Sequence, residues 1–486
     1  MIRFSVIIPA FNAAGTIAET VESVLAQTYP HWEIIVVNDG STDKTEEVAN
    51  RYARMDGRIH VVTQRNLGEA AARNSGITET SHDWLVFLDS DDWIAADYLF
   101  QMADAIRTQP DVVAVHCGYA RVAMDGTKVV ENYQPPTGNL FDVLACRPAF
   151  PVNACVVRKT VVTESGAFDP SFKTCPDWDL WQRIARTGAT FGAARKVLAF
   201  YRMRPDSASL NAIQLLKDGF RIIETGHSND SRVANPHPKY ASGITKAGIE
   251  NQKIYFLCWC AGLLIGADKD PRPLFEVAMP SQVNGHLYPN AIARIIFDSV
   301  PLISCQPPRK WETLFLDVQP RCDQFLDDLE KHLSQPDFAD QTMFEIKKLV
   351  LSHSATWQPI VQELQEAIHQ TEKRNLEWQN LTESLKQQLT EQQTEMKKLQ
   401  DRAEQSENKT KELQDRVEQS ENKTKELQEL VEHRTKEIQE LETLAERRRL
   451  ESDEWQATAL RNKGLYRQLR TKFWVRLGKK LRILKI

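Results

Sequence analysis

The first 117 residues alternate short apolar segments with amphipathic ones, and this alternation restricts the possible folds more than any other feature of the chain. The apolar segments are rich in branched and aromatic residues and are too short for helices, so they are predicted to be buried strands. They span residues 4–10, 32–37, 59–63, 84–88 and 112–117. Strands separated by helices predict a mostly parallel α/β sheet with helices on both faces.

The segment from Thr16 to Leu25 illustrates the helical signal between the strands. Ile17, Val21 and Leu25 are four residues apart and would place apolar side chains on one face of a helix. Thr16 and Glu19 have the spacing of a capping box, in which each side chain accepts a hydrogen bond from the other residue's backbone N–H. We therefore expect a helix that begins after Thr16 and is capped by these two side chains.

Polar clusters follow four of the predicted strands at the point where each strand ends. They are Asn12, Asp39, residues 65–68 and an acidic turn made of Asp89, Ser90, Asp91 and Asp92. Ligands of parallel sheets bind in the crevice beyond the carboxyl ends of the strands. The four clusters are therefore expected to line one crevice.

The acidic turn, residues 89–92, needs a physical reason because it brings three carboxylates close together. They repel one another and raise each other's pKa unless a cation lies among them. Oxygen ligands of this kind suit a hard divalent ion, Mn²⁺ or Mg²⁺, which also binds substrate phosphates. The alternative is an aspartate-rich turn that caps the next helix. Four polar clusters at one edge of the sheet favour a metal site.

The residue types in the predicted crevice indicate a nucleotide. Asp39 could accept hydrogen bonds from a base or a ribose, and Arg65 and Arg73 could neutralise phosphate. Neither the Walker pattern nor the dinucleotide glycine pattern is present, so the sequence lacks the motifs that usually indicate NTP hydrolysis or hydride transfer. The alternatives are a helix-capping acid at Asp39 and a solvent-facing Arg73.

Four segments in this region resemble, in order, successive motifs of the family two glycosyltransferases, which are inverting enzymes with a GT-A fold. The segments are SVIIPAFNAAGTI (5–17), VVNDGSTD (36–43), RNLGEAAARNSGI (65–77) and FLDSDDW (87–93). The resemblance implies a GT-A domain over residues 1–209, Rossmann-like with a mostly parallel sheet. It also implies a nucleotide-sugar donor such as a UDP-sugar.

The resemblance further implies roles for individual residues. Asp91, Asp89 and Asp92 would form the metal motif for Mn²⁺ or Mg²⁺, although which two acids contact the metal varies within the family. The implied donor-binding residues are Pro9, Asn12, Asp39, Arg65, Asn66, Gly68, Arg73, Asp89, Ser90 and Arg204. Relatives often have a histidine at the position of Arg204. A cation there could bind diphosphate but could not ligate the metal.

Residues 166–188 resemble the acceptor-side motif of the same family. An inverting transfer needs a base that takes the proton of the acceptor hydroxyl. The match implies that Asp177 is this base, with Trp178 and Asp179 on the acceptor side and Asp179 as the alternative base. Pro176 replaces the first acid of the family's pair. Without the resemblance, Asp177 would be read as an acid that favours a helix N-terminus.

The second half of the chain lacks such motifs and is divided by pattern alone. Residues 210–357 are predicted to be a helical accessory domain. Residues 358–457 carry apolar residues at heptad spacing and contain two near-identical fourteen-residue units, at 401–414 and 415–428. They are predicted to form a long coiled-coil helix that makes a homo-oligomer, with a parallel dimer favoured. The alternative is a lone solvated helix held by ion pairs four residues apart.

The C-terminal segment, residues 458–486, is a basic amphipathic tail. Its last 26 residues, 461–486, carry ten Lys or Arg and no acid, although the whole chain has a net charge of −5. Leucines and Phe473 form an apolar stripe among these charges, which is typical of a helix that binds an anionic membrane surface. The stripe favours lipid over nucleic acid. A helix that docks on the protein's own acidic surface is the remaining alternative.

Together these features predict a glycosyltransferase that moves a sugar to a hydroxyl of a glycan or lipid-linked acceptor. Its expected location is cytoplasmic, on the inner face of the cell membrane. The eight cysteines lack metal-type spacing, and the longest apolar run, 254–267, is too short for a bilayer span. The alternatives are a non-catalytic coiled-coil scaffold with a degenerate transferase head, and a nucleotidyltransferase, which would release pyrophosphate.

Overall fold

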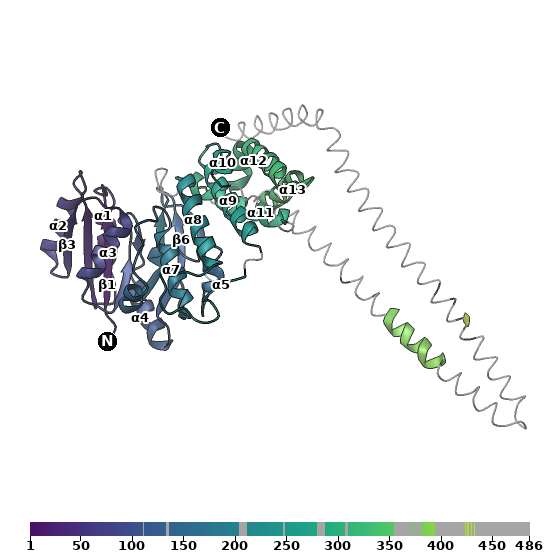
Figure 1. Cartoon of the computed structure of the whole chain (residues 1–486), viewed down its shortest axis with the longest axis horizontal. Coiled ribbons are helices and arrows are strands. Elements are labelled where there is room, and N and C mark those ends of the chain that lie inside the picture. The colour runs from purple at the N-terminus through teal and green to yellow at the C-terminus, as the bar shows by residue number, and fades with distance from the viewer. Residues whose placement is uncertain are drawn as a thin grey trace, which may run out of the picture. The chain divides into compact units, whose positions relative to one another are not determined.

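The computed structural model describes most of the first 353 residues and a few positions beyond them. The described ranges are 1–109, 111–132, 136–203, 211–245, 248–278, 287–306 and 310–353, with 373, 378, 382–393, 423, 425–426, 429 and 432. The chain divides into two compact units, Met1–Gln362 and Glu363–Ile486, and the first contains the sheet (Figure 1). The predicted coiled coil lies mostly outside the described residues and the basic tail entirely so, and both stay predictions.

The predicted alternation of strands and helices is present in the first 122 residues. Its elements are β1 (Phe4–Ala10), α1 (Ile17–Leu25), β2 (Trp32–Asp39), α2 (Thr45–Met55), β3 (Ile59–Gln64), α3 (Glu69–Glu79), β4 (Trp84–Phe87), β5 (Trp93–Ile94), α4 (Tyr98–Thr108) and β6 (Ala114–Val122). They are followed by β7 (Lys128–Asn132), α5 (Phe141–Leu144), η1 (Val152–Ala154), β8 (Cys155–Arg158), α6 (Lys159–Glu164), α7 (Pro176–Arg186) and β9 (Phe191–Arg202).

In the described part of the chain these strands form one sheet in the order β3-β2-β1-β4-β8-β6-β9-β5, and β7 pairs with β6. β1 to β4 are parallel, whereas β8 runs antiparallel to both β4 and β6. Because β8 is antiparallel to both of its neighbours, β4 and β6 point the same way. β9 is parallel to β6, so β6 and β9 both share the direction of β1 to β4. The carboxyl ends of β1 to β4, β6 and β9 therefore lie at one edge.

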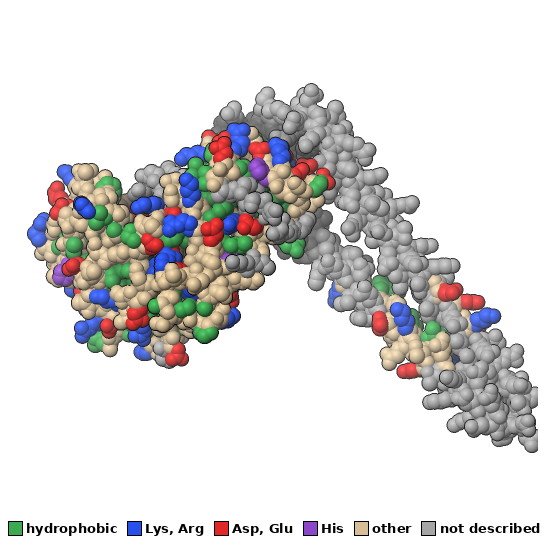
Figure 2. All heavy atoms as spheres, in the orientation of Figure 1, with side chains coloured by type: hydrophobic (Ala, Val, Ile, Leu, Met, Phe, Trp, Pro, Cys, Tyr) green, Lys and Arg blue, Asp and Glu red, His purple; other side chains and the backbone are tan. Residues whose placement is uncertain are grey.

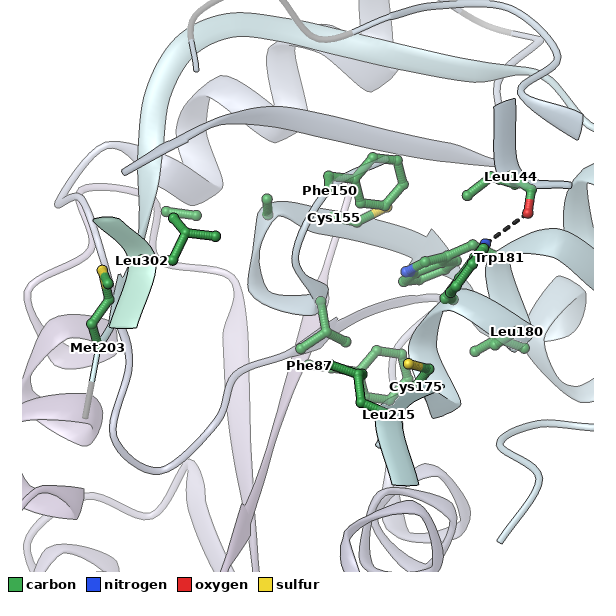
Figure 3. Close-up of a cluster of buried hydrophobic side chains, with 14 of the residues drawn as sticks. Phe87, Leu144, Phe150, Cys155, Cys175, Leu180, Trp181, Met203, Leu215 and Leu302 are labelled. Carbon is green, nitrogen blue, oxygen red and sulfur yellow. Dashed lines mark hydrogen bonds between the residues drawn. The ribbon is translucent and has the colours of Figure 1, made fainter. Parts of the chain in front are cut away.

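Both faces of the sheet are covered by helices, as the fold class requires. Ile35 and Val37 of β2 pack with Ala72 of α3 on one face. Ile34 and Val36, whose side chains point the other way, belong to the main core. That core continues under α7, where the rings of Phe150 and Trp181 lie 5.7 Å apart between centroids (Figure 3). The mostly parallel α/β fold is confirmed.

A helical region follows the sheet and begins with α8 (Ala212–Gly226). Its further helices are α9 (Ile249–Gly266), α10 (Pro273–Ala278), α11 (Pro289–Ser304), α12 (Trp311–Leu333) and α13 (Phe338–His353) (Figure 1). The buried Gln182 and Arg186 join this helical region to α7, which belongs to the sheet domain. Gln182 Nε2 donates to Ile222 O at 2.9 Å, and the Arg186 guanidinium donates to Thr225 O at 2.6 Å and to Tyr240 O at 2.9 Å.

The capping box predicted for α1 is wrong, although the helix begins where expected. Thr16 is the N-cap residue, but its side chain accepts no hydrogen bond from the first turn. Glu19 instead forms an ion pair with the guanidinium of Arg202, at the end of β9. The Glu19 carboxylate is therefore engaged by a residue 183 positions away rather than by the backbone of Thr16.

The helices of the described residues and the charges on one face of the molecule are two separate features of the protein. None of their helices combines the length and the apolar composition that crossing a bilayer would need. On the face shown in Figure 2, acidic and basic side chains are interspersed over the sheet domain and the helical region. This surface gives no sign of a single-charge field on that face.

The contact between α3 and β1 provides a test of the packing. A Cβ on Gly76 of α3 would lie 2.4 Å from Cγ2 of Ile7, which is fully buried. Alanine gains about 1 kcal/mol over glycine in a helix, but overpacking a core costs about 1–3 kcal/mol. We expect Gly76→Ala to lower the free energy of unfolding by up to about 2 kcal/mol in urea titrations. Gly15→Ala, which meets nothing within 4 Å, is the control and should be neutral.

Candidate functional site

The loops after β1 and β2 are fastened to each other at the carboxyl edge of the sheet. Asn12 adopts a positive φ of 50°, and its Oδ1 accepts a hydrogen bond from Thr42 N at 2.8 Å. Asn12 N donates to Ser41 Oγ at 3.0 Å, and Ala13 N donates to Thr45 Oγ1 at 2.7 Å. The Asn12 side chain, predicted to bind donor, therefore orders this corner of the site.

Asp39 organises the loop between β3 and α3. It is 3% exposed, and its carboxylate accepts hydrogen bonds from Gln64 Nε2 at 2.7 Å, Leu67 N at 2.9 Å and Gly68 N at 2.8 Å. Gly40 (φ 71°) is required beside it, because a Cβ there would lie 2.7 Å from Asn66 N. A carboxylate has about four acceptor positions, so three loop bonds leave about one for a ligand.

Arg73 is the buried cation of the site. Its side chain is 2% exposed, and Nη2 lies 2.6 Å from Asp89 Oδ1. The same nitrogen contacts Glu69, one turn earlier on α3, and the guanidinium lies 5.2 Å from the ring centre of Phe168. The Nε of Arg73 is buried without a hydrogen-bond partner among the described residues. A buried, unpaired N–H at this position points to an acceptor supplied by a ligand.

Two acids of the acidic turn, Asp89 and Asp92, point in different directions. Asp89 faces Arg73, as described above. Asp92 is 1% exposed and turns inward, where its carboxylate accepts hydrogen bonds from Asn153 Nδ2 at 2.9 Å and Arg202 N at 2.8 Å. Burial and the neighbouring Asp91 and Asp89 raise the pKa of Asp92. The inward acid is thus engaged by the protein, while Asp89 remains at the crevice.

Arg202 holds the acidic turn in place, a role that the sequence did not reveal. Its Nε donates to Asp91 O at 2.7 Å, and its guanidinium lies 4.6 Å from the ring centre of Trp93. With the bond to Asp92 and the ion pair to Glu19, this residue joins the end of β9 to the turn and to α1. The parallel direction of β4 and β9 makes these contacts possible.

Asp177 lies in the first turn of α7 and is half-buried. Burial raises its pKa; Arg73 and the N–H of Trp178 oppose the shift, and Asp89 adds to it. These interactions bring Asp177 into the same charged group as Arg73 and Asp89, although it follows Asp89 by 88 positions. The acid predicted as the base therefore interacts electrostatically with two of the residues predicted to bind the donor.

The two neighbours of Asp177, which were predicted on the acceptor side, are buried. Trp178 is 1% exposed and donates from Nε1 to Leu144 O at 2.6 Å. Asp179 is also 1% exposed, and it accepts from Arg183 Nε at 2.9 Å and from Arg232 Nη2 at 2.8 Å. Because both of its carboxylate oxygens accept hydrogen bonds from guanidinium groups, Asp179 has a structural role. Asp177, the other candidate base, interacts electrostatically with Arg73 and Asp89.

The segment before α7 is attached to α3 by Asn74. Asn74 Nδ2 donates to Phe168 O at 2.8 Å, and Phe168 N donates to Asn74 Oδ1 at 3.0 Å. The Phe168 ring packs edge-on against Phe87, at the end of β4, with 4.8 Å between ring centroids. Adjacent residues of α3 thus contact two distant segments. Arg73 contacts the acidic turn, and Asn74 contacts the segment that precedes α7.

The other predicted residues differ in their exposure. Pro9 is buried within β1, Ser90 is half-buried, and Arg65, Asn66 and Gly68 are exposed on the loop that Asp39 orders. Arg204 lies outside the described residues. Two exposed apolar side chains at the same edge were not predicted: Phe11 is 48% exposed and Leu67 is 47% exposed. Phe11 directly follows the predicted strand 4–10 and precedes Asn12. An aromatic residue at this position, just after a strand, is the sequence signal that could have identified it.

The carboxylates fit a divalent ion that takes part of its coordination from a ligand. Among the described residues no group of three His, Cys, Asp or Glu side chains has the arrangement of a metal site. Asp89 and Asp91 could supply two oxygens, and Mg²⁺ typically uses one or two carboxylates with phosphates and water. Partial desolvation raises the pKa of Glu69, whose side chain is still 46% exposed; Arg73 opposes the shift, and Asp89, Asp177 and Asp91 add to it. That repulsion indicates negative charge which a cation would neutralise.

Comparison with known proteins gives an independent view of the chain. Residues 5–162 match the family model "Glycosyl transferase family 2". The putative teichuronic acid biosynthesis glycosyltransferase TuaG of Bacillus subtilis is 32% identical over 228 residues, which are 46% of this chain and 89% of TuaG. The putative glycosyltransferase EpsH of B. subtilis is 38% identical over 128 residues, 26% of this chain. The match spans only 37% of EpsH.

Among the solved structures that match the chain is S. aureus TarS 1–349 in complex with UDP. It has 16% sequence identity and a TM-score of 0.40, and the match covers 72% of this chain and 91% of TarS 1–349. The mannosyltransferase PcManGT from Pyrobaculum calidifontis has 19% identity and the same TM-score of 0.40, and covers 67% of this chain and 87% of its own.

The contrast between Asp177 and Asp179 generates a stability test. Breaking a buried ion pair costs about 3–5 kcal/mol, so Asp179→Asn should lower the free energy of unfolding by about that amount. Asp177 is different because a raised pKa means that its ionised form is disfavoured in the folded state. Asp177→Asn should leave the stability unchanged or higher at pH 7.5, and this gain should fade as the pH falls toward the pKa.

Urea titrations of both variants at pH 7.5 and pH 5 measure these differences. Equal losses of stability for Asp177→Asn and Asp179→Asn would contradict the distinction drawn between the two acids.

Proposed function

Because the chain belongs to glycosyltransferase family 2, we propose that it transfers a sugar from a nucleotide-sugar donor to a hydroxyl of a glycan or lipid-linked acceptor. The observation that carries this proposal is the charged group at the carboxyl edge of the parallel strands, in which Asp89, Arg73 and Asp177 interact. A diphosphate-bearing donor and a base for the acceptor need such residues in one crevice.

The donor would bind across the loops after β1, β2 and β3. Phe11 offers an exposed ring on which a base could stack, and Asp39 keeps about one acceptor position for a base or ribose donor. The buried Nε of Arg73, which lacks a partner in the described residues, is suited to a phosphate oxygen. Arg65 and Asn66, exposed on the neighbouring loop, could close over the diphosphate.

Mn²⁺ or Mg²⁺ would be held by Asp89 and Asp91, with Asp92 supporting the turn from inside. When bound, such an ion stabilises the negative charge of the leaving diphosphate. Arg202 contributes by holding the backbone of Asp91 and the carboxylate of Asp92, so that the turn presents its acids in a fixed direction. Arg73 orients the Asp89 carboxylate through their ion pair.

Asp177 would act as the general base. A carboxylate with a raised pKa accepts a proton more readily at neutral pH than an ordinary aspartate does. It would take the proton of the attacking hydroxyl on the side of the sugar opposite the diphosphate, and attack from that side inverts the anomeric centre. Trp178 and Asp179 would act indirectly, by fixing the first turn of α7.

The cellular role follows as part of the proposal. TuaG and EpsH are named glycosyltransferases, TuaG of teichuronic acid biosynthesis, and we assign this chain to the assembly of a cell-surface polysaccharide. The predicted basic tail would bring the enzyme to the inner face of the membrane, where lipid-linked acceptors are found. Vesicle binding by the full chain would test the tail separately from catalysis.

The first test of this function compares two carboxylate variants. We expect Asp91→Asn and Asp177→Asn each to lower Mn²⁺-dependent release of nucleoside diphosphate by about 100-fold or more, because a general base alone contributes about 10²–10⁴-fold. UDP-glucose, UDP-N-acetylglucosamine and GDP-mannose serve as donors. Only Asp91→Asn should weaken Mn²⁺-dependent binding of UDP, measured by calorimetry.

Asp97→Asn is the matched control for these variants, because Asp97 pairs with Lys196 at the start of α4, away from the crevice. A protein that binds UDP but shows no turnover sensitive to either change would be the non-catalytic scaffold. Release of pyrophosphate would indicate a nucleotidyltransferase.

The second test concerns the nucleobase. Stacking on an aromatic side chain is worth about 1–3 kcal/mol per base, so Phe11→Ala should weaken UDP binding by about 5-fold to 150-fold. Phe100→Ala is the control, because Phe100 is similarly exposed at 52% but lies on α4. Equal affinities of the two variants for UDP would remove Phe11 from the donor site.

A further inference from the structure

Asp218 of α8 contacts the segment that leads to Asp177, although it belongs to the helical region in which the sequence shows no motif. The Asp218 side chain is 1% exposed. Its Oδ2 accepts hydrogen bonds from Lys173 N at 2.8 Å, Thr174 N at 3.0 Å and Thr174 Oγ1 at 3.0 Å. Its Oδ1 accepts from Gln214 Nε2 at 2.9 Å. One buried carboxylate therefore binds two successive backbone N–H groups ahead of α7.

These bonds fix a point very near Asp177. Thr174 precedes Asp177 by three positions, and the two residues between them have little freedom. Cys175 is 7% exposed, and its C=O accepts the first bond of α7, from Asp179 N at 3.2 Å. Pro176 has a φ restricted by its ring. A displacement of Lys173 and Thr174 would therefore be transmitted to the first turn of α7.

The other end of the same segment is fixed from the donor side. Asn74 of α3 binds both backbone groups of Phe168, as described above. Between these two attachments, Phe172 is 3% exposed and lies under Arg221 of α8, whose guanidinium is 4.1 Å from its ring centre. Residues 168–174 thus run between α3 and α8 with both ends hydrogen-bonded.

We propose that Asp218 is a positioning residue for the transfer reaction: by fixing Lys173 and Thr174 it sets the place of Asp177 relative to the donor. This inference rests on the proposed function, in which Asp177 is the base. It makes α8 part of the transferase machinery rather than of a separate accessory domain. The buried Asp218 does not touch the donor residues, so its effect is on the chemical step and not on nucleotide binding.

The variant that tests the proposal is Asp218→Asn, which keeps the shape but replaces one acceptor oxygen with an N–H₂ donor. Glu33→Gln is the matched control. Glu33 is 8% exposed and accepts three comparable bonds, from Ser5 Oγ at 2.6 Å, Ser81 N at 2.7 Å and Ser81 Oγ at 2.6 Å. Because Ser5 and Glu33 lie at the amino ends of β1 and β2, this control is at the opposite edge of the sheet.

Two measurements on the full chain decide the outcome. Hydrogen exchange of peptides covering residues 168–177 should become faster in Asp218→Asn and stay unchanged in Glu33→Gln. Turnover of UDP-glucose, UDP-N-acetylglucosamine and GDP-mannose with Mn²⁺ should show kcat lowered about 10-fold or more for Asp218→Asn, with KM and UDP affinity unchanged. Thr174→Val, which removes one of the three bonds, should show a smaller effect in the same direction.

The proposal is overturned if exchange of these peptides is unchanged, or if kcat falls no more than in Glu33→Gln. A parallel loss of UDP affinity would also overturn it, because a general loss of structure affects binding as well. A different result would contradict the proposed function itself. In that case Asp177→Asn would keep the turnover of the unmodified protein. If Asp177→Asn loses turnover and Asp218→Asn does not, only the positioning role is wrong. Thr174→Val supplies the same test if Asp218→Asn does not fold.

Discussion

The charged group around Arg73 is the constraint on which the site depends. A guanidinium with a 2% exposed side chain cannot be left without counter-charges, and it contacts Glu69 on its own helix and Asp89 at the end of β4. Asp177 of α7 interacts electrostatically with Arg73 and Asp89. Three carboxylates around one cation leave an excess of negative charge, which a ligand-bound divalent ion would neutralise. The sheet makes this arrangement possible by bringing the carboxyl ends of its parallel strands to one edge.

The aspartates of this region have two kinds of environment, which differ in how far the protein itself supplies the hydrogen bonds of the carboxylate. Asp92 and Asp179 are each 1% exposed and are bound by the protein itself, Asp92 by Asn153 and Asp179 by two arginines. Asp89 and Asp177 are each only partly buried. The first kind rigidifies the turn and the first turn of α7; the second kind can meet a ligand. Sequence motifs contain both kinds without distinguishing them.

Much of the fold follows from the sequence because its elements are local. The strands 4–10, 32–37 and 59–63 were predicted within two residues of β1, β2 and β3, since apolar periodicity depends on neighbours along the chain. Contacts between distant residues could not be predicted in this way. The insertion of β8 between β4 and β6, the pair of Glu19 with Arg202, and the inward turn of Asp92 all depend on residues 39 or more positions away.

The same reasoning explains why the helical region appeared to be without function. A motif is recognisable when the residues that act together are close in sequence, whereas Asp218 acts on Lys173 and Thr174 from 44 or 45 positions away. Its only local signature is a buried acid on an otherwise amphipathic helix, and in a sequence such an acid cannot be told from a solvated one. A base whose ionised form is disfavoured by burial must be held by its surroundings, because relaxation toward solvent would lower its pKa. The bonds from α8 and α3 oppose that relaxation, which links the packing of the helical region to the chemistry at the edge of the sheet.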